Sequence, residues 1–219
     1  MKVVNASYEI LDTLNGEEIL RKIERIARVC YKSTDKITEG SAEKMIRSLI
    51  KNNHDAMLEH YSFSVSFICD RGISHEIVRH RIASFAQEST RYCNYGSKDG
   101  EITVIEPFYL LVDGERVTVD NWAERYGAWR EACEVAEKSY LRMIADGATP
   151  QEARAVLPTS TKTEIVMTAN LREWRHFFNL RAVGTTGKPH PQMQEIAIPL
   201  LKELQEKIPV IFDDLVVEG

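Results

Sequence analysis

Residues 62–69, Ser-Phe-Ser-Val-Ser-Phe-Ile-Cys, alternate between apolar and small polar side chains. Successive side chains of a β-strand point to opposite faces, so every second residue from Phe63 to Cys69 shares one face. The serines at 62, 64 and 66 lie on the other face. This alternation predicts a strand with one buried side.

Patterns typical of helices lie on both sides of this strand. Apolar residues recur every three or four positions from Glu17 to Tyr31, and a similar stripe follows Ser41. Further helices are predicted from Ser74 to about Phe85, from Asp120 to Gly147, over 171–182 after an Asn170 cap, and over 192–207. Strands are predicted at 101–112 and 163–169. Helices around separated strands predict an α+β fold with a mostly antiparallel sheet, in a single domain spanning 1–219.

Composition excludes several classes of protein. The chain has 219 residues, 43% hydrophobic and 28% charged, as is typical of a soluble globular protein. Its net charge of −5 argues against general nucleic-acid binding, which needs a basic face. No signal peptide or long apolar run is present, so we expect a cytoplasmic protein that does not enter a membrane. The four cysteines form no CxxC pair and predict neither a zinc ribbon nor a disulfide framework.

Basic side chains gather between Arg71 and Arg91 of this acidic chain. The planar guanidinium groups of Arg79, Arg81 and Arg91 suit phosphate oxygens, which they can bind in a bidentate manner. The pattern therefore indicates a phosphorylated ligand. The alternative is the solvated basic face of a helix.

The segment after these arginines is rich in side chains that form hydrogen bonds. Gln87 can donate to and accept from the edge of a base, and Ser89 and Thr90 follow it. This combination favours nucleotide recognition. The alternative, Ser89 as a nucleophile, needs a base within hydrogen-bond reach.

A second basic segment runs from Asn170 to Arg181. On a helix, Arg181 continues the apolar stripe of Leu171, Trp174 and Phe178 and so points inward. An inward arginine keeps its charge and needs an anionic partner, which is either a structural carboxylate or a ligand.

Residues 54–60, His-Asp-Ala-Met-Leu-Glu-His, form a third cluster. His54 and Glu59 do not have the helical spacing of zinc ligands, and Asp55 is as well explained by a helix start. We expect no metal.

Together these segments resemble the flavin-dependent thymidylate synthase family, whose signature is RHR, seven residues, then SxRY. Here the signature reads Arg79-His80-Arg81, seven residues, then Ser89-Thr90-Arg91-Tyr92. HDAMLEH precedes it, and AVLPTSTKTE and NLREWRHFFNLR follow it, in the family's order. The resemblance covers nearly the whole chain.

The resemblance implies the residues that bind each ligand. Those implied for dUMP are Glu76, Ile77, Val78, Arg79, Gln87, Glu88, Ser89, Thr90, Arg91, Arg154 and Arg181. Those implied for FAD are Ala56, Glu59, Arg79, His80, Arg81, Gln87, Asn170, Leu171, Arg172 and His176. Arg91 would bind the phosphate of dUMP. Arg181 would be the catalytic residue, because its charge against the uracil ring stabilises negative charge that develops there.

The implied reaction is the reductive methylation of dUMP to dTMP, a step of nucleotide biosynthesis. The carbon donor would be 5,10-methylenetetrahydrofolate, released as tetrahydrofolate, and NADPH would supply reducing equivalents through FAD. His54, Ala56 and Glu59 would contact flavin from a neighbouring subunit, which implies a homotetramer with shared active sites. No cysteine nucleophile is expected, so Cys93 would be a packing residue, with a reactive thiol as the alternative.

Two other functions compete with this hypothesis. A phosphatase would use a histidine beside arginines, but it would carry RHG just after a first strand. A nucleotide-binding or RNA-binding module without catalysis would need, for RNA, a basic stripe interleaved with aromatic residues, which this chain lacks.

Overall fold

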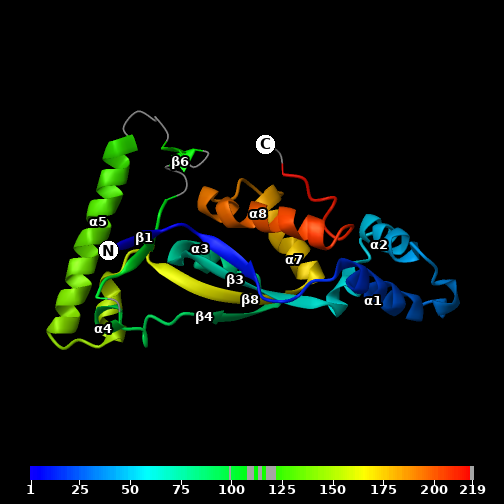
Figure 1. The fold of residues 1–219 in the computed structure, drawn as a ribbon, viewed down its shortest axis with the longest axis horizontal. Coiled ribbons are helices and arrows are strands. Elements are labelled where there is room, and N and C mark those ends of the chain that lie inside the picture. Colours follow the sequence, from blue (N-terminus) through cyan, green and yellow to red (C-terminus); the bar gives the residue numbers. More distant parts are fainter. Residues whose placement is uncertain (99, 108–110, 113–114, 117–121, 218–219) are drawn as a thin grey trace. The chain divides into compact units, whose positions relative to one another are not determined.

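A computed structural model describes residues 1–98, 100–107, 111–112, 115–116 and 122–217. The chain forms two compact units (Figure 1). The first unit comprises Met1–Ser7, Phe67–Arg79 and Ala86–Val166, and the second comprises Tyr8–Ser66, His80–Phe85 and Met167–Gly219. The single-domain organisation expected from the sequence stays a prediction.

The predicted α+β class and mostly antiparallel sheet are confirmed. Four strands form the largest sheet, in the order β2 (Ser7–Ile10), β3 (Ser62–Asp70), β8 (Lys162–Asn170) and β4 (Ala83–Gln87). In β3, the side chains from Phe63 to Cys69 that the alternation assigns to the core are at most 1% exposed. The strand predicted at 163–169 is β8. Both β3 and β8 contribute residues to each unit.

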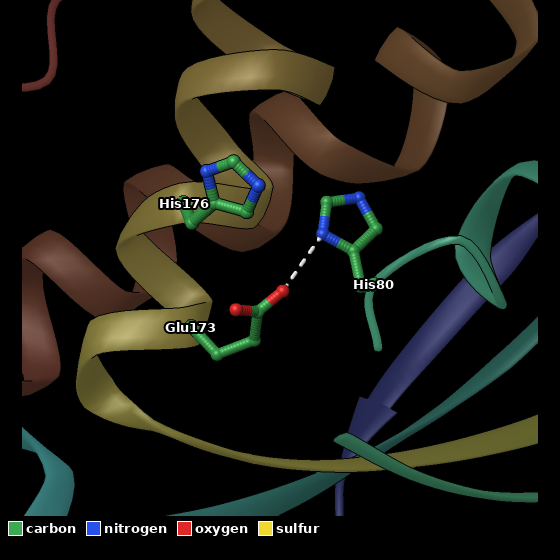
Figure 2. A group of neighbouring side chains, drawn as sticks. All are labelled: His80, Glu173 and His176. Carbon is green, nitrogen blue, oxygen red and sulfur yellow. Dashed lines mark hydrogen bonds and ion pairs between the residues drawn. The ribbon is translucent and has the colours of Figure 1, made fainter. Parts of the chain in front are cut away.

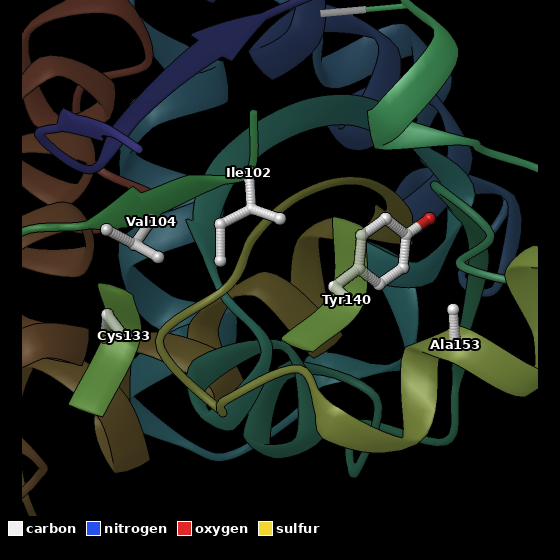
Figure 3. Close-up of a cluster of buried hydrophobic side chains, with 5 residues drawn as sticks. All are labelled: Ile102, Val104, Cys133, Tyr140 and Ala153. Carbon is white, nitrogen blue, oxygen red and sulfur yellow. The ribbon is translucent and has the colours of Figure 1, made fainter. Parts of the chain in front are cut away.

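One pair of strands in the first unit is parallel. β1 (Lys2–Val4) runs parallel to β5 (Thr103–Ile105). Helices α5 (Trp122–Ala145) and α6 (Pro150–Ala153) supply Cys133, Tyr140 and Ala153 to a core that also holds Ile102 and Val104 (Figure 3). The short elements of this unit are α4 (Tyr95–Lys98), β6 (Leu111–Val112), β7 (Glu115–Arg116) and η4 (Arg154–Val156).

Two expectations from the sequence fall partly outside the described residues. The strand predicted at 101–112 is observed as β5 and β6, with residues 108–110 outside the description. The expected start of the long helix at Asp120 also lies outside it, whereas its end near Gly147 agrees with α5.

The second unit is mainly helical. Its elements are α1 (Gly16–Val29), η1 (Thr34–Lys36), α2 (Ser41–Lys51), η2 (Asp55–His60), α7 (Leu171–Phe178), the π-helical turn η5 (Asn179–Val183) and α8 (Pro191–Lys207), which contains Pro199. Helices α1 and α2 lie side by side (Figure 1). Trp174 stacks on Phe63 with ring centroids 5.0 Å apart, and both are buried.

The prediction of a helix from Ser74 to about Phe85 is wrong. The helix α3 (Arg71–Ile77) begins earlier, because the carboxylate of Asp70 accepts from the backbone N–H of Ile73 at 2.7 Å. It also ends earlier, because residues 83–87 alternate in burial and pair in the sheet as β4. Arg79, His80 and Arg81 therefore lie in the turn between a helix and a strand, where sheet pairing overrides local helix propensity.

None of the helices in the described ranges is long and apolar enough to cross a membrane.

Candidate active site

The turn after α3 carries three consecutive side chains that differ in solvent exposure. Arg79 and Arg81 are exposed, whereas His80 is 3% exposed. Arg79 is the last residue of its segment in the first unit, and His80 begins a segment of the second unit. The two arginines can reach a ligand from solvent, whereas His80 acts within the packed second unit.

His80 lies between the carboxylate of Glu173 and the guanidinium of Arg181, both in the second unit. Its Nδ1 atom is 3.1 Å from Oε1 of Glu173, and Nε of Arg181 donates to its Nε2 at 3.3 Å. Figure 2 shows Glu173 and His176 on one helix, with the Glu173 carboxylate directed at His80. Burial, followed by the charges of Arg181 and His176, lowers the pKa of His80 to about 4. His80 is therefore neutral at physiological pH.

His80, Glu173 and His176 offer nitrogen and oxygen atoms that all lie within 4.8 Å of one another. Such a group can ligate a metal ion. However, both ring nitrogens of His80 are engaged in hydrogen bonds, and Arg181 brings a positive charge to this group. The absence of a metal stays a prediction.

Arg181 lies in the π-helical turn η5 and is half-buried. The expectation that it points inward agrees with its bond to His80, because that histidine is buried. The buried carboxylate of Glu173 was not among the residues singled out by the sequence. Its only signal was its position three residues after the helix cap Asn170.

Arg172 and Glu59, both implied for FAD, form an ion pair with each other. Nη1 of Arg172 lies 2.6 Å from Oε1 of Glu59, and the two side chains are 55% and 45% exposed. Exposed pairs of this kind contribute little to stability, so a ligand can displace one partner at small cost.

The start of α7 fixes two other implied residues. The side-chain oxygen of Asn170 accepts from the backbone N–H of Glu173 at 2.9 Å, which confirms the predicted cap. Leu171 is fully buried, so only its backbone could meet a ligand. His176 is exposed.

His54, Ala56 and Met57 border a small cavity of the second unit. The space of about 280 Å³ lies among residues of α1, α2 and η2 and the residues next to them in the chain. The lining is mainly apolar, with Tyr31 beside these three residues. The structure thus brings His54 and Ala56 together at one cavity.

Hydrogen bonds in the first unit hold the segment after β4. The amide nitrogen of Gln87 donates to the hydroxyls of Ser74 at 2.9 Å and Thr163 at 3.2 Å. Arg71 donates to the carbonyl of Glu88 at 3.4 Å and to the same threonine at 3.3 Å. The donors of Gln87 are therefore used within the protein, and its amide oxygen is the atom suited to a ligand donor.

The carboxylate of Glu88 also has partners within the first unit. It accepts from the hydroxyl of Tyr95 at 2.8 Å and from Nζ of Lys162 at 3.0 Å. Burial, then the bond to Glu88, raises the pKa of Tyr95, so the phenol stays protonated. The sequence did not identify Lys162 as a support because it lies 74 residues from Glu88. It did not identify Tyr95 either, although Tyr95 is only seven residues from Glu88, because that spacing follows no helix or strand period.

Thr90 is bonded to another residue implied for dUMP, Arg154. It is 6% exposed, and its hydroxyl accepts from Nη1 of Arg154 at 3.4 Å. Ser89 accepts from the backbone N–H of Arg91 at 3.3 Å, a contact that shapes the loop. Arg91 and Arg154 are exposed and, among the described residues, neither forms an ion pair with a carboxylate. Their guanidinium donors are available to an anion.

The end of α3 supplies the remaining implied residues. Ile77 is fully buried, whereas Val78 is 37% exposed. The carbonyl of Glu76 accepts from the backbone N–H of Arg79 at 3.2 Å, which closes the helix. Ile77 can therefore meet a ligand only through its backbone.

Comparison with known proteins shows the family of this chain. Residues 9–210 match the family model described as thymidylate synthase complementing protein. The flavin-dependent thymidylate synthase of Corynebacterium aurimucosum is 33% identical, over 94% of this chain and 83% of its own length. The enzyme of the same name from Corynebacterium efficiens is 34% identical, over 93% and 82%. That from Pyrococcus horikoshii is 33% identical, over 94% and 79%.

A solved structure agrees in fold. A UMP/dUMP methylase from Streptomyces cacaoi, bound with 5-Br dUMP, has a TM-score of 0.82 at 24% identity, covering 97% of this chain and 96% of its own. The fold and the matched segments define a methyltransferase enzyme, as predicted. The chain belongs to the flavin-dependent thymidylate synthase family, which confirms the resemblance.

Proposed function

We propose that this chain is an FAD-dependent thymidylate synthase that reductively methylates dUMP to dTMP. The carbon donor would be 5,10-methylenetetrahydrofolate, released as tetrahydrofolate, and the reductant would be NADPH. The observation that carries the proposal is the segment from Arg79 to Arg91, which keeps the family signature and leaves its exposed arginines open to solvent.

In this proposal the first unit binds the phosphate of dUMP. Arg91 and Arg154 flank Thr90, which is bonded to Arg154. Two guanidinium groups without carboxylate partners suit a phosphate dianion, because each can donate a pair of charge-assisted hydrogen bonds. The supports from Arg71, Tyr95 and Lys162 keep the loop in place before dUMP arrives.

The second unit would contact the flavin. Arg172, with its exposed partner Glu59, can exchange a surface ion pair for a phosphate oxygen. Other members of this set are Ala56, His80, Arg81, Asn170, Leu171 and His176, with His54 at the same cavity as Ala56. The exposed guanidinium groups of Arg81 and Arg172 and the apolar cavity at Ala56 fit a molecule that carries phosphates and flat rings. Bound FAD supplies the redox chemistry of the reaction.

Arg181 would be the catalytic residue. Its guanidinium cannot be deprotonated, so it can stabilise negative charge that develops on the uracil ring. Its bond to His80 limits the rotation of its side chain. A fixed charge requires no reorganisation during the reaction, which is the condition for an electrostatic contribution to the rate.

Spectroscopy and product analysis test this proposal. Freshly purified protein is expected to show flavin absorbance, which bleaches on anaerobic addition of NADPH, and faster when dUMP is present. Adding methylenetetrahydrofolate should then yield dTMP and tetrahydrofolate. Protein that retains no flavin, binds none on addition of FAD and forms no dTMP would contradict the proposal and favour a phosphatase or a binding module.

A further inference from the structure

Three polar side chains form a continuous hydrogen-bonded series in the second unit. Glu173 lies 3.1 Å from Nδ1 of His80, and Nε2 of the same ring lies 3.3 Å from Nε of Arg181. Glu173 is 6% exposed and His80 is 3% exposed. Burying such groups is unfavourable unless each is hydrogen-bonded. The folded unit is therefore destabilised if any of these hydrogen bonds is lost.

The arginine decides which nitrogen of His80 carries the proton. Nε of Arg181 always bears a hydrogen, so it can only donate. The Nε2 atom that faces it must therefore offer a lone pair, and the single proton of the neutral ring lies on Nδ1. The Nδ1 atom faces the carboxylate of Glu173, which accepts that proton (Figure 2).

A charged His80 would disturb this series. Protonation at Nε2 would place two donors against each other and add a second positive charge beside Arg181. The lowering of the His80 pKa to about 4, by burial and by Arg181 and His176, agrees with a neutral ring.

We propose that Glu173 is a positioning residue that holds the proton of His80 on Nδ1, so that Nε2 remains an acceptor and orients Arg181. Without an acceptor at Nδ1, the proton is free to occupy Nε2. The ring would then present a donor to a donor, and the guanidinium would lose this support. The catalytic consequence rests on the function proposed above, whereas the tautomer is a property of the folded chain.

Two substitutions at position 173 test whether the hydrogen-bond acceptor or the negative charge of Glu173 holds the proton on Nδ1 of His80. In Glu173→Gln, the amide oxygen can still accept from Nδ1–H. In Glu173→Leu, a side chain of similar size offers no acceptor. The cap at the start of α7 is retained in both variants, because Asn170 accepts from the backbone of residue 173.

The first readout is the tautomer of His80 in the full chain. Protein labelled with ¹⁵N-histidine would be recorded at pH 7 by long-range ¹H–¹⁵N correlation, with His80→Asn used to assign the signal. We expect Nδ1–H in the wild type and in Glu173→Gln, and a shift toward Nε2–H in Glu173→Leu. An Nε2–H ring in the wild type, or an unchanged tautomer in Glu173→Leu, would overturn the proposal.

The second readout is the rate of dTMP formation. Loss of one supporting hydrogen bond predicts a kcat about tenfold lower for Glu173→Leu. The KM for dUMP should stay within about twofold, because the residues proposed to bind its phosphate are unchanged. Glu173→Gln should restore most of kcat. A Glu173→Leu variant with normal kcat would refute the role.

Three outcomes keep the two proposals distinct. If Glu173→Leu does not fold, the wild type and Glu173→Gln still decide the tautomer. If the wild type forms no dTMP but shows Nδ1–H, the proposed function fails and the tautomer assignment stands. If added Zn²⁺ removes the Nδ1–H signal at stoichiometric concentration, the cluster with His176 is a metal site and the positioning role is overturned.

Discussion

At the residue scale, the arginines of the candidate site occupy two kinds of environment. Arg172 already pairs with a carboxylate, and Arg181 is bonded to His80. Arg91 and Arg154 have no carboxylate partner among the residues that the structure describes. A guanidinium without a carboxylate partner breaks no ion pair when it binds an anion, so these two are the better candidates for phosphate.

Arg91→Ala should weaken dUMP binding by about tenfold to a hundredfold, the worth of a charge-assisted hydrogen bond to phosphate. Titration calorimetry of the FAD-loaded protein with dUMP measures the change. Arg142→Ala is a matched control, because that side chain is 85% exposed on α5 of the same unit. Unchanged dUMP affinity in Arg91→Ala would remove Arg91 from the phosphate site.

Arg181→Ala should abolish methyl transfer and leave FAD bound, since the lost charge acts on the substrate ring rather than on the flavin. Product formation and flavin absorbance are measured on the same sample. Arg21→Ala serves as the control, because Arg21 is 69% exposed on α1 of the same unit. Full activity in Arg181→Ala would refute the catalytic role.

At the scale of elements, short turns decide where the functional side chains lie. The early end of α3 places Arg79 and Arg81 in an exposed turn. The π-helical turn η5 extends α7 through Arg181, and Gly184 follows it with a φ of 83°. A π turn widens the helix by one residue and so changes the direction of a side chain, which is why such turns recur at functional sites.

The start of α1 offers a test of packing between elements. A Cβ on Gly16 would clash with the backbone carbonyl oxygen of Lys207, at the end of α8. Gly16→Ala should therefore destabilise the protein by about 1–3 kcal/mol, because backbone must shift. Urea unfolding followed by circular dichroism measures this.

A second glycine provides the control for that substitution. Gly127 lies inside α5, and a Cβ there meets nothing within 4 Å. Gly127→Ala should stabilise the protein by about 0.5–1 kcal/mol, the difference in helix propensity. If Gly16→Ala stabilises the protein to the same extent, the close approach of α1 and Lys207 is wrong.

At the scale of the whole molecule, the two ligand sets divide between the two units. All residues implied for dUMP except Arg181 belong to the first unit, and all those implied for FAD except Arg79 and Gln87 belong to the second. Each unit has its own core, around Tyr140 in the first and Trp174 in the second.

Stability should depend on pH through His80. Its pKa is about 4 in the folded protein and about 6.5 when unfolded, so the unfolded state binds more protons between these values. Stability is therefore present above about pH 6.5 and falls by at most about 3 kcal/mol as the pH drops to 4. Urea unfolding of the FAD-free protein across this range measures the slope.

Glu173 contributes the opposite slope, because burial raises its pKa and the folded state then holds a proton longer. Glu173→Gln removes that contribution and leaves the causes of the His80 shift, which are burial, Arg181 and His176. The loss of stability toward pH 4 should be clear in this variant and absent when His80→Gln is added. A slope that persists in the double variant would assign it to another group.

The homotetramer that the resemblance implies should be required for activity if active sites are shared between subunits. Specific activity is then expected to fall at the concentration where sedimentation velocity shows dissociation of the tetramer. Full activity of an isolated single chain would contradict sharing through His54, Ala56 and Glu59.

Strong local patterns allowed much of this protein to be predicted from its sequence. Alternation identified β3, apolar stripes identified α1 and α2, and the cap at Asn170 identified α7, because each depends on residues that are neighbours in the chain. The family followed from motifs that are also local. The chemistry of the candidate residues was thus accessible before any coordinates.

Contacts between distant residues were accessible only in the folded chain. Residues 78–85 were expected to be helical, but pairing of β4 with β8 made them a turn and a strand. The partners of Glu88 and of His80 lie as far as 74 and 101 residues away along the chain. Such pairs have no period or spacing in the sequence, because burial and sheet register, not local propensity, bring them together.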